Sequence, residues 1–290
     1  MLCKRIIARL DIKGNKLIKG IRFEGVRVIG DPNSAARKYA NDGADELLYI
    51  DAVASLYGRN SIASILKITS NEIFIPITAS GGIRSIADAK NLVMAGAGKI
   101  AVNTAGLRDP KLLKDLVETF GSQCVVVSIQ ARRIQGAKSW EAMSEMGREK
   151  SGKDVLDWIQ EVQKIGVGEI LLTSVDQDGT LKHPDFELIK NASMITKIPL
   201  IVSGGLTETS DISSVLNNNS ISGVALGGSL HYDRQRITNL KADLINKNLS
   251  IREKNLQKLF LSKKKPLDNL KVGIIDYGMG NQQSLANALN

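Results

Sequence analysis

The sequence predicts an α/β fold, a TIM (β/α)8 barrel built from two half-barrel repeats. The first observation is an internal repeat, in which the segment Ile75–Ile83 returns in similar form as Ile198–Leu206, each with a Ser-Gly-Gly run. The second is a regular alternation of short apolar runs with amphipathic segments, which indicates a parallel sheet covered by helices. The third is the length, since eight such units over ~250 residues fit a closed barrel better than an open sheet.

The predicted strands are short apolar runs, rich in β-branched residues, that are bounded by polar or glycine-containing segments. In chain order they are Arg5–Asp11, Glu46–Asp51, Phe74–Ala79, Lys99–Asn103, Cys124–Gln130, Glu169–Ser174, Leu200–Ser203 and Gly223–Leu226. The predicted helices lie between them, and several begin at an Asp, Ser or Pro start signal. They are Asn33–Asn41, Ser61–Thr69, Ile86–Ala95, Pro110–Thr119, Val155–Lys164, Pro184–Thr196, Asp211–Leu216 and Arg236–Lys247.

The composition of the 290 residues, 43% hydrophobic and 24% charged, is ordinary for a soluble globular protein. No stretch approaches the ~18 consecutive apolar residues of a membrane span, so we expect a cytoplasmic protein. Cys3 and Cys124 each adjoin an apolar strand and are expected as core thiols rather than as a disulfide or metal site. His183 and His231 are not spaced as a metal pair, so no metal and no organic cofactor is predicted.

The formal net charge of +9 is spread along the chain, and only 4% of the residues are aromatic. Few side chains are therefore present to stack on bases, and we expect a small anionic substrate rather than nucleic acid.

The chain after the barrel has a different character. We expect residues 1–254 to form the barrel and residues 255–270, with the run Lys263–Pro266, to form a basic linker. Residues 271–290 are typical of a strand, a glycine turn and the start of a helix. Because one strand and part of a helix cannot form a core, this segment is interpreted as the truncated start of a second domain.

Two glycine pairs follow the third and seventh predicted strands, where a barrel of this type carries its chemistry. Glycine lets the backbone approach an anion closely, and the turn before a helix leaves N–H groups free, so each half is expected to hold one phosphate. The residues predicted for the two cradles are Gly81, Gly82, Asn103 and Thr104 in the first half and Gly204, Gly205, Gly228 and Ser229 in the second. The alternative is that each glycine pair merely turns the chain.

The segment Lys13–Gly30 is longer than a typical strand-to-helix connection and strongly basic. We interpret it as a loop that acts as a lid over an anionic site, with a solvated surface loop as the alternative.

Several motifs in order across residues 1–250 resemble the HisF family, the cyclase subunit of imidazole glycerol phosphate synthase. The motifs are Lys4–Asp11, Gly30–Pro32, Asp45–Leu47, Phe120–Gln123 and Gly168–Asp176. The tail Val272–Asn281 similarly resembles the start of HisH, the glutaminase that partners this family. No cysteine follows it, so the glutaminase nucleophile is expected on another chain.

The resemblance implies that ammonia from the glutaminase enters the base of the barrel and passes through its core to a bisphosphorylated ribulosyl carboxamide. Ring closure and cleavage then give imidazole glycerol phosphate and an aminoimidazole carboxamide ribotide. The residues that match the family's charged ammonia gate are Arg5, Glu46, Lys99 and Glu169. Two cations and two anions around one ring can also form a purely structural ion-pair cluster.

The resemblance also implies catalytic roles, and this chain departs from the pattern at one of them. Asp11 matches the first of two acid–base aspartates, whereas Gln130 stands at the second position, where an amide can orient a group but cannot exchange a proton near neutral pH. Lys19 is expected to close on the substrate and Asp178 to orient it. Arg9 places a bulky cation where the family usually has a small side chain.

Other departures are Ser80 in place of a glycine and Gly98 in place of an acidic residue expected to help dock the glutaminase. They leave two alternatives open. One is a HisF-like protein that supplies ammonia for amidination of a surface-polysaccharide sugar, a branch that Leu56–Asn60 and Ser139–Glu141 resemble. The other is a catalytically impaired ammonia conduit.

Overall fold

The computed structural model describes residues 3–54 and 62–252. The predicted linker 255–270, the predicted second-domain segment 271–290 and the motif Leu56–Asn60 lie outside the described residues.

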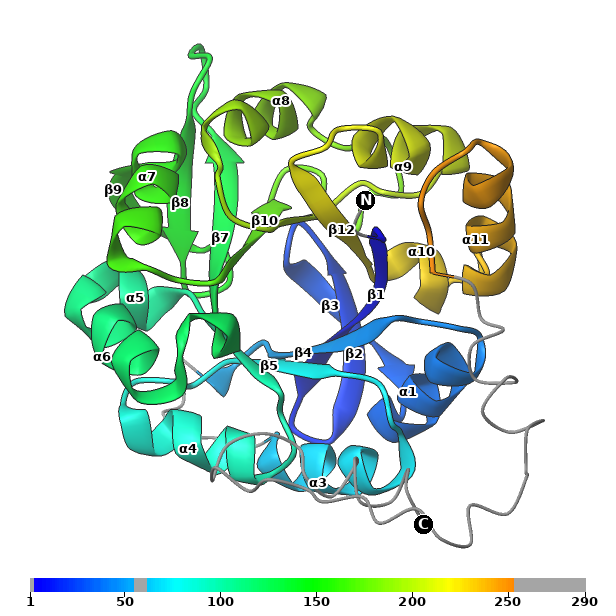
Figure 1. Cartoon of the computed structure of the whole chain (residues 1–290), viewed down its shortest axis with the longest axis horizontal. Helices are drawn as coiled ribbons and strands as arrows, with labels where there is room; N and C mark the ends of the chain where they lie inside the picture. Colours follow the sequence, from blue (N-terminus) through cyan, green and yellow to red (C-terminus); the bar gives the residue numbers. More distant parts are fainter. Residues whose placement is uncertain (1–2, 55–61, 253–290) are drawn as a thin grey trace, which may run out of the picture.

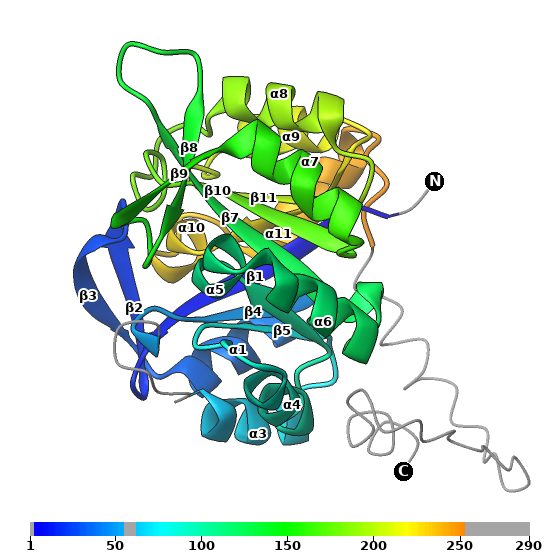
Figure 2. The ribbon, with the colours of Figure 1, turned by 90° about the vertical axis from the view of Figure 1, so that its left-hand side faces the viewer.

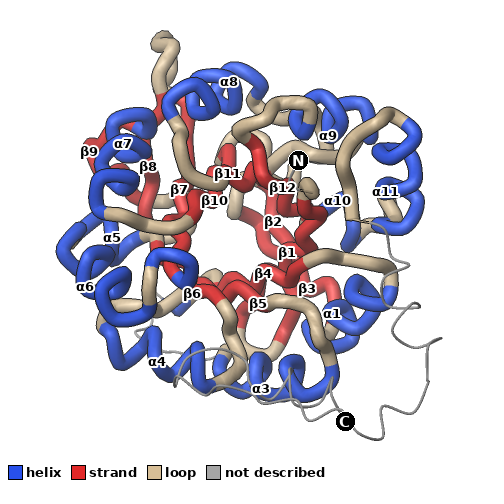
Figure 3. The backbone as a smooth tube through the Cα atoms, in the orientation of Figure 1, coloured by secondary structure: helices blue, strands red, loops and turns tan. Residues whose placement is uncertain are grey.

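Eight parallel strands close into a barrel, which confirms the predicted fold (Figure 1 and Figure 3). In chain order they are β1 (Arg5–Lys13), β4 (Glu46–Asp51), β5 (Ile77–Ser80), β6 (Lys99–Val102), β7 (Val125–Arg133), β10 (Glu169–Ser174), β11 (Leu200–Ser203) and β12 (Ile221–Leu226). Strand β1 pairs with β12, and β7 pairs with β10, so that the sheet has no open edge within the barrel.

Helices surround the barrel on its outside (Figure 3). They are α1 (Pro32–Asn41), α3 (Ala63–Glu72), α4 (Ile86–Met94), α5 (Thr104–Arg108), α6 (Pro110–Phe120), α7 (Val155–Ile165), α8 (Phe186–Ile195), α9 (Thr209–Leu216), α10 (Gly228–His231) and α11 (Ile237–Asn246). Side-chain caps begin several of them, as for α7, where Asp154 accepts bonds from the backbone N–H groups of Leu156 and Asp157. In the described chain, no helix is long and apolar enough to cross a membrane.

The prediction of a loop over Lys13–Gly30 is wrong in its local structure, because most of the segment forms a β-hairpin of β2 (Lys16–Ile21) and β3 (Glu24–Gly30). Strand β2 continues antiparallel from β1. The second half carries the matching feature, a hairpin of β8 (Trp140–Ser144) and β9 (Glu149–Asp154) that pairs with β7 (Figure 2). Neither outer strand is a continuous apolar run, since β3 mixes charged residues with the exposed Val26 and Val28, and β9 has no large apolar side chain. The rule used to predict strands therefore did not mark the hairpins.

The third barrel strand, β5, begins three residues later than predicted, at Ile77 instead of Phe74. Phe74 is half exposed rather than buried, and Pro76, which lacks a backbone N–H, precedes the first ladder pair at Ile77. The short helices α5 and α10 were not predicted either, because one or two turns carry too few residues to show a helical period.

The repeat is visible in the backbone. Gly81 and Gly82 have φ of 109° and 71°, and Gly204 and Gly205 have φ of 97° and 74°. The serine before each pair donates the same hydrogen bond, from Ser80 Oγ to the Ala101 carbonyl and from Ser203 Oγ to the Ala225 carbonyl, each at 2.9 Å. The two halves therefore build the same turn twice.

The core has two layers. A large apolar cluster fills the space between the strands and the helices. A smaller one occupies the barrel interior and comprises Ile7, Leu48, Ile50, Ala101, Val126, Leu171, Ile201 and Ala225. Because strand side chains alternate between the two faces, these interior residues are separated by outward-facing ones along each strand.

The prediction that both cysteines are core thiols is wrong for Cys3, which is exposed, and holds only partly for Cys124, which is half-buried. Each precedes its strand rather than belonging to it, so its side chain lies at the rim of the barrel.

Candidate active site

Four charged side chains meet at the carboxyl end of the barrel. We call Arg9, Asp11, Lys19 and Asp178 the carboxyl-end quartet. Arg9 donates from Nε to Asp11 Oδ1 at 2.9 Å and lies 3.2 Å from Asp178 Oδ1, while Lys19 Nζ lies 3.0 Å from Asp11 Oδ2 and 2.7 Å from Asp178 Oδ2. All four are nearly fully buried. Two cations and two anions thus neutralise one another away from water.

The quartet explains the charge state of Asp11. Burial alone raises the pKa of a carboxyl, but the attraction of Arg9 and Lys19 outweighs it and holds the pKa of Asp11 well below its usual value. Asp11 is therefore an anion near neutral pH, able to accept a proton or a hydrogen bond rather than to donate one.

Arg9 belongs to this site through the register of β1. Residues Arg5, Ile7, Arg9 and Asp11 alternate along one face of the strand, and Arg9 packs its guanidinium 5.4 Å from the ring centre of Phe23 and 3.2 Å from Ser203 Oγ. The sequence marked Arg9 only as unusual. The sequence could not show that Arg9 pairs with both aspartates, because Asp178 lies in the loop after β10, which is adjacent to β1 only in the folded barrel.

Lys19 reaches the quartet from β2, and the hairpin is fastened over the site at a second place. The Arg22 amide donates to the Asp178 carbonyl at 2.7 Å. Gly179, with φ of 70°, lies so close to the Gly20 carbonyl that a Cβ there would stand 2.0 Å from it. The hairpin and the loop after β10 are thus packed backbone to backbone.

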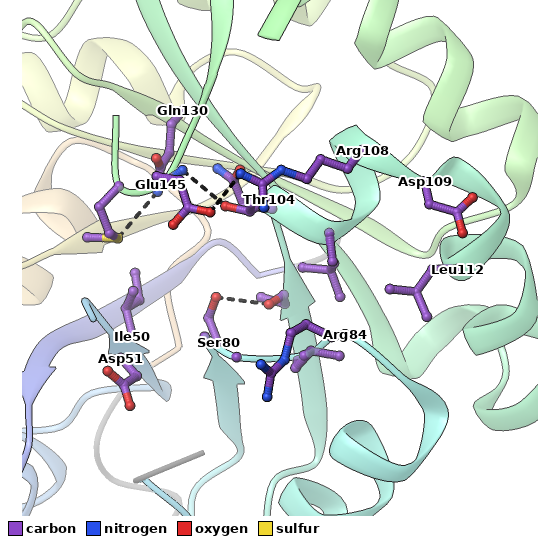
Figure 4. Close-up of a pocket in the computed structure, with 18 of the residues that line it drawn as sticks. Ile50, Asp51, Ser80, Arg84, Thr104, Arg108, Asp109, Leu112, Gln130 and Glu145 are labelled. Atoms are coloured by element: carbon purple, nitrogen blue, oxygen red, sulfur yellow. Dashed lines mark hydrogen bonds and ion pairs between the residues drawn. The ribbon is translucent and has the colours of Figure 1, made fainter. Parts of the chain in front are cut away.

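The first cradle surrounds a pocket of about 330 Å³ at the ends of β5 and β6 (Figure 4). Gly81, Gly82, Asn103 and Thr104 line it together, as the sequence predicted for one set. A Cβ on Gly81 would stand 2.7 Å from the Asp51 carbonyl oxygen, so the turn requires glycine.

Gln130 and Glu145 line the same pocket. The Gln130 side chain is buried, and its Nε2 is 3.6 Å from Met146 Sδ. The carboxylate of Glu145 is also buried and pairs through Oε1 with Arg108 at 3.0 Å. The sequence did not single out Glu145, since the turn between β8 and β9 has no periodic pattern that would mark it.

The second cradle gathers Gly204, Gly205, Gly228, Ser229 and Asp178. The space among them is about 20 Å³, room for about one water molecule by the usual measure. The buried Ser229 Oγ has no hydrogen-bond partner among the described residues. The two cradles therefore share a backbone but differ in size, and the second is nearly closed.

His231 ends α10 close to Lys19 and the second cradle. Its Nδ1 bonds the Tyr39 hydroxyl at 2.7 Å. Burial, reinforced by the charge of Lys19, lowers the pKa of His231 to about 4, so the ring is neutral near pH 7.

A second charged ring closes the opposite end of the barrel, formed by the four predicted gate residues, which we call the amino-end quartet. Arg5 pairs with Glu46 at 2.7 Å and with Glu169, and Lys99 lies 3.4 Å from Glu46 and 3.0 Å from Glu169. Burial alone lowers the pKa of Arg5, but the two glutamates outweigh this and raise it. Arg5, Lys99 and Glu169 also border a surface pocket of about 810 Å³.

The apolar interior cluster lies between the two quartets along the strands. On β1 the order is Arg5, Ile7 and Arg9, and on β10 it is Glu169 followed by Leu171. A neutral molecule such as ammonia can enter such an apolar layer at lower cost than an ion.

The motif Ser139–Glu141 and the possibility of a metal site are the remaining features considered from the sequence. Trp140 of the motif Ser139–Glu141 is buried at the start of β8, where its Nε1 donates to Asp185 Oδ2 at 2.9 Å, so its role is in the fold. Within residues 3–54 and 62–252, no three His, Cys, Asp or Glu side chains gather as metal ligands.

Known proteins resemble this chain across the barrel. A family model described as Histidine biosynthesis protein matches residues 5–236, a range that contains both quartets and both cradles. The imidazole glycerol phosphate synthase subunit HisF of Legionella pneumophila is 54% identical over 202 residues, covering 70% of this chain and 95% of that relative. The subunit of the same name from Dictyoglomus turgidum is 40% identical over 252 residues, covering 87% and 99%. That from Bacillus cereus strain Q1 is 39% identical over 252 residues, covering 87% and 100%.

Proposed function

Because the chain belongs to the HisF family of histidine biosynthesis proteins, we propose that it is the cyclase subunit of an imidazole glycerol phosphate synthase. In this role it uses ammonia to convert a bisphosphorylated ribulosyl aminoimidazole carboxamide to imidazole glycerol phosphate and aminoimidazole carboxamide ribotide.

The observation that carries the proposal is the pair of matched glycine turns at the carboxyl end of the barrel. Gly81–Gly82 and Gly204–Gly205 have nearly the same backbone angles and the same preceding serine bond. Two anion cradles on opposite halves of one barrel suit a substrate with a phosphate at each end. The second cradle must widen to admit its phosphate, and Lys19, buried beside Gly228, is the cation placed to follow it.

The carboxyl-end quartet then lies between the two phosphates, where the reacting atoms would be. Asp11, held as an anion by Arg9 and Lys19, accepts a proton or orients the attacking nitrogen. Asp178 holds Lys19 and Arg9 from the other side and orients the substrate next to the second cradle. Gln130 serves as a polar group that positions the substrate but transfers no proton.

Ammonia is proposed to come from a separate HisH-type glutaminase that docks at the amino end of the barrel. Arg5, Lys99 and Glu169 of the amino-end quartet border the surface pocket on that face, and the apolar interior cluster leads from the quartet to the carboxyl-end quartet. The quartet acts as a gate when one of its ion pairs opens, since a closed ring of four charges leaves little room for a molecule to pass.

The sugar-amidating alternative receives no support from the relatives described above, which carry the name of the cyclase subunit. The alternative of a catalytically impaired ammonia conduit differs from the proposed cyclase in one testable respect. It predicts that ammonia passes through the apolar interior but that no cyclisation takes place at the carboxyl end.

The experiment is turnover of the bisphosphorylated ribulosyl carboxamide by the purified protein at saturating ammonium, followed by the appearance of both products. A Gln130→Asp variant is assayed beside it. Turnover by the unaltered protein supports the cyclase. No turnover by the unaltered protein, with turnover by the variant, supports the impaired conduit, and no turnover by either refutes the proposed reaction.

A further inference from the structure

Glu145 is a buried carboxylate with one free oxygen in the pocket of the first cradle. Its side chain is nearly fully buried, and Oε2 has no hydrogen-bond partner among the described residues. An ionised oxygen that is buried without a partner is costly, and such atoms gather at sites where a ligand supplies the missing donor. The oxygen therefore points to a ligand rather than to a structural contact.

The backbone holds Glu145 in place from both sides. Its φ is 48°, in the left-handed region that non-glycine residues rarely adopt, and Met146 follows with φ of 56°. The Glu145 amide donates to Thr104 Oγ1 at 3.0 Å, and Arg108 holds Oε1 at 3.0 Å. Strain of this kind is kept where surrounding contacts fix it, and here they fix a carboxylate in the site (Figure 4).

The atoms that share the pocket suit a donor-rich part of a ligand. Asn103 Oδ1 and Gln130 Oε1 are also buried oxygens without a partner among the described residues. Together with Glu145 Oε2 they present three acceptors, which fit N–H and O–H groups in the part of the ligand that adjoins the phosphate, while the glycine turn holds the phosphate itself. Of the three, only the carboxylate can take up a proton.

The other acidic groups near the reacting centre are already committed. Asp11 and Asp178 each bind two cations in the carboxyl-end quartet. Asp51, which lines the first cradle, accepts from the Val53 amide at 3.0 Å and turns the chain after β4. Asp109 caps α6 by accepting from the Lys111 amide at 3.1 Å.

We propose that Glu145 is the second proton-transfer residue of the site, working opposite Asp11. The inference rests on the proposed cyclase function. When ammonia adds to the ketose carbonyl, a C–N bond forms and the carbonyl π electrons move to oxygen. Glu145 Oε2 takes a proton from the new ammonium nitrogen and gives it to the alkoxide oxygen, which leaves a neutral carbinolamine. A second proton then passes the same way from the nitrogen to the hydroxyl, the C–O bond breaks as the nitrogen lone pair forms the C=N bond, and water leaves. The products are an imine, water and the regenerated carboxylate, so no further reactant is needed. This assigns to the β8–β9 turn a task that Gln130 cannot perform.

The test is a set of variants assayed at saturating ammonium. Glu145→Gln keeps the shape and removes the proton acceptor, so kcat should fall by ~10²–10⁴-fold with KM changed little. Adding Gln130→Asp to this variant should restore kcat at least ~10-fold, because a carboxylate returns to the same pocket. Glu149→Gln is the matched control, since Glu149 also binds Arg108, at 3.2 Å, but is exposed and outside the pocket.

Glu145→Asp provides the same test should the amide variant not fold, because it keeps the carboxylate but withdraws it by one methylene; a lower kcat with KM preserved supports the role. Unaltered kcat in either folded variant would overturn the role of Glu145 and leave the cyclase function standing. A loss in Glu145→Gln that Gln130→Asp does not repair, or that Glu149→Gln reproduces, would also overturn it. An unaltered protein that gives no product would overturn the cyclase function, and the role of Glu145 with it.

Discussion

Replacing Arg9 with methionine tests whether the carboxyl-end quartet is a single charge-balanced unit. The substitution keeps an unbranched side chain of similar length but leaves two buried carboxylates, Asp11 and Asp178, with only Lys19 between them. Removing one partner of a buried ion pair typically costs ~3–5 kcal/mol, and Arg9 binds both carboxylates, so we expect the upper part of that range. For a domain of this size each kcal/mol lowers Tm by ~2–4 °C, so a loss of ~4–5 kcal/mol gives a total fall of roughly 8–20 °C.

The loss of stability caused by Arg9→Met should be larger near neutral pH than in acid. In the unaltered protein the folded pKa of Asp11 lies below its unfolded value of about 3.9, so its contribution to stability is complete above about pH 4 and is lost as the pH falls through the folded pKa. Arg9→Met removes one stabilising cation and raises the folded pKa of Asp11. The difference in free energy of unfolding between the two proteins should therefore be largest near pH 7 and narrow below about pH 4, where the carboxylate takes up a proton.

The assay is thermal and urea unfolding of Arg9→Met and of the control Arg37→Met at pH 7 and at about pH 3. Arg37 pairs with Glu72 on the surface, where both side chains are about half exposed, so its loss should cost ~0–1 kcal/mol. A deficit for Arg9→Met no larger than that of the control, or one that is the same at both pH values, would refute the charge-balance argument.

Three further predictions concern the gate, the glycine turns and His231. Lys99→Met should lower turnover that depends on glutamine and a glutaminase, while turnover with added ammonium persists. Lys114→Met, at an exposed position, is the control, and an equal fall in both kinds of turnover for Lys99→Met would contradict the gate. Gly204→Ala should cost ~1–3 kcal/mol of stability and weaken substrate binding, because a Cβ would stand 2.7 Å from the Ser174 carbonyl oxygen at a φ of 97°. Gly30→Ala is the control and should change stability little, because a Cβ there has no atom within 4 Å. Similar losses at both positions would contradict the requirement for glycine. His231, with a pKa lowered to about 4, contributes stability that is complete above about pH 6.5 and declines as the pH falls toward 4. His231→Gln should therefore make the free energy of unfolding, measured with urea, depend less on pH between about 6.5 and about 4. An unchanged dependence on pH would show that the ring is not buried as a neutral group.

The order of strands and helices could be predicted because each barrel strand is a continuous apolar run and each long helix has a periodic apolar face. Glu46–Asp51, Glu169–Ser174 and Leu200–Ser203 were predicted with their observed bounds. The hairpins could not be found in this way, since β3 is mostly exposed and its side chains share no buried face that would leave a period in the sequence.

Two kinds of signal predicted parts of the site. The internal repeat grouped the two glycine pairs, because they follow equivalent strands, whereas Asp11, Lys19, Asp178 and the four amino-end charges were expected only because they match the HisF pattern. Arg9 was noticed only as a departure, because its partners come from β2 and from the loop after β10, far away in the chain. Glu145 left no signal at all, since a carboxylate two residues before a glycine is usually a solvated turn residue, and only the fold shows it buried in the first cradle.

The most direct test of the proposed cyclase is incorporation of labelled nitrogen. The purified protein is incubated with the bisphosphorylated ribulosyl carboxamide and ¹⁵N-ammonium, and the products are followed by nitrogen and phosphorus NMR. The two-cradle account predicts that one ¹⁵N atom enters the imidazole ring of a monophosphorylated product while a second monophosphorylated product carries no label. A folded protein that binds the substrate but yields no labelled imidazole would contradict the account.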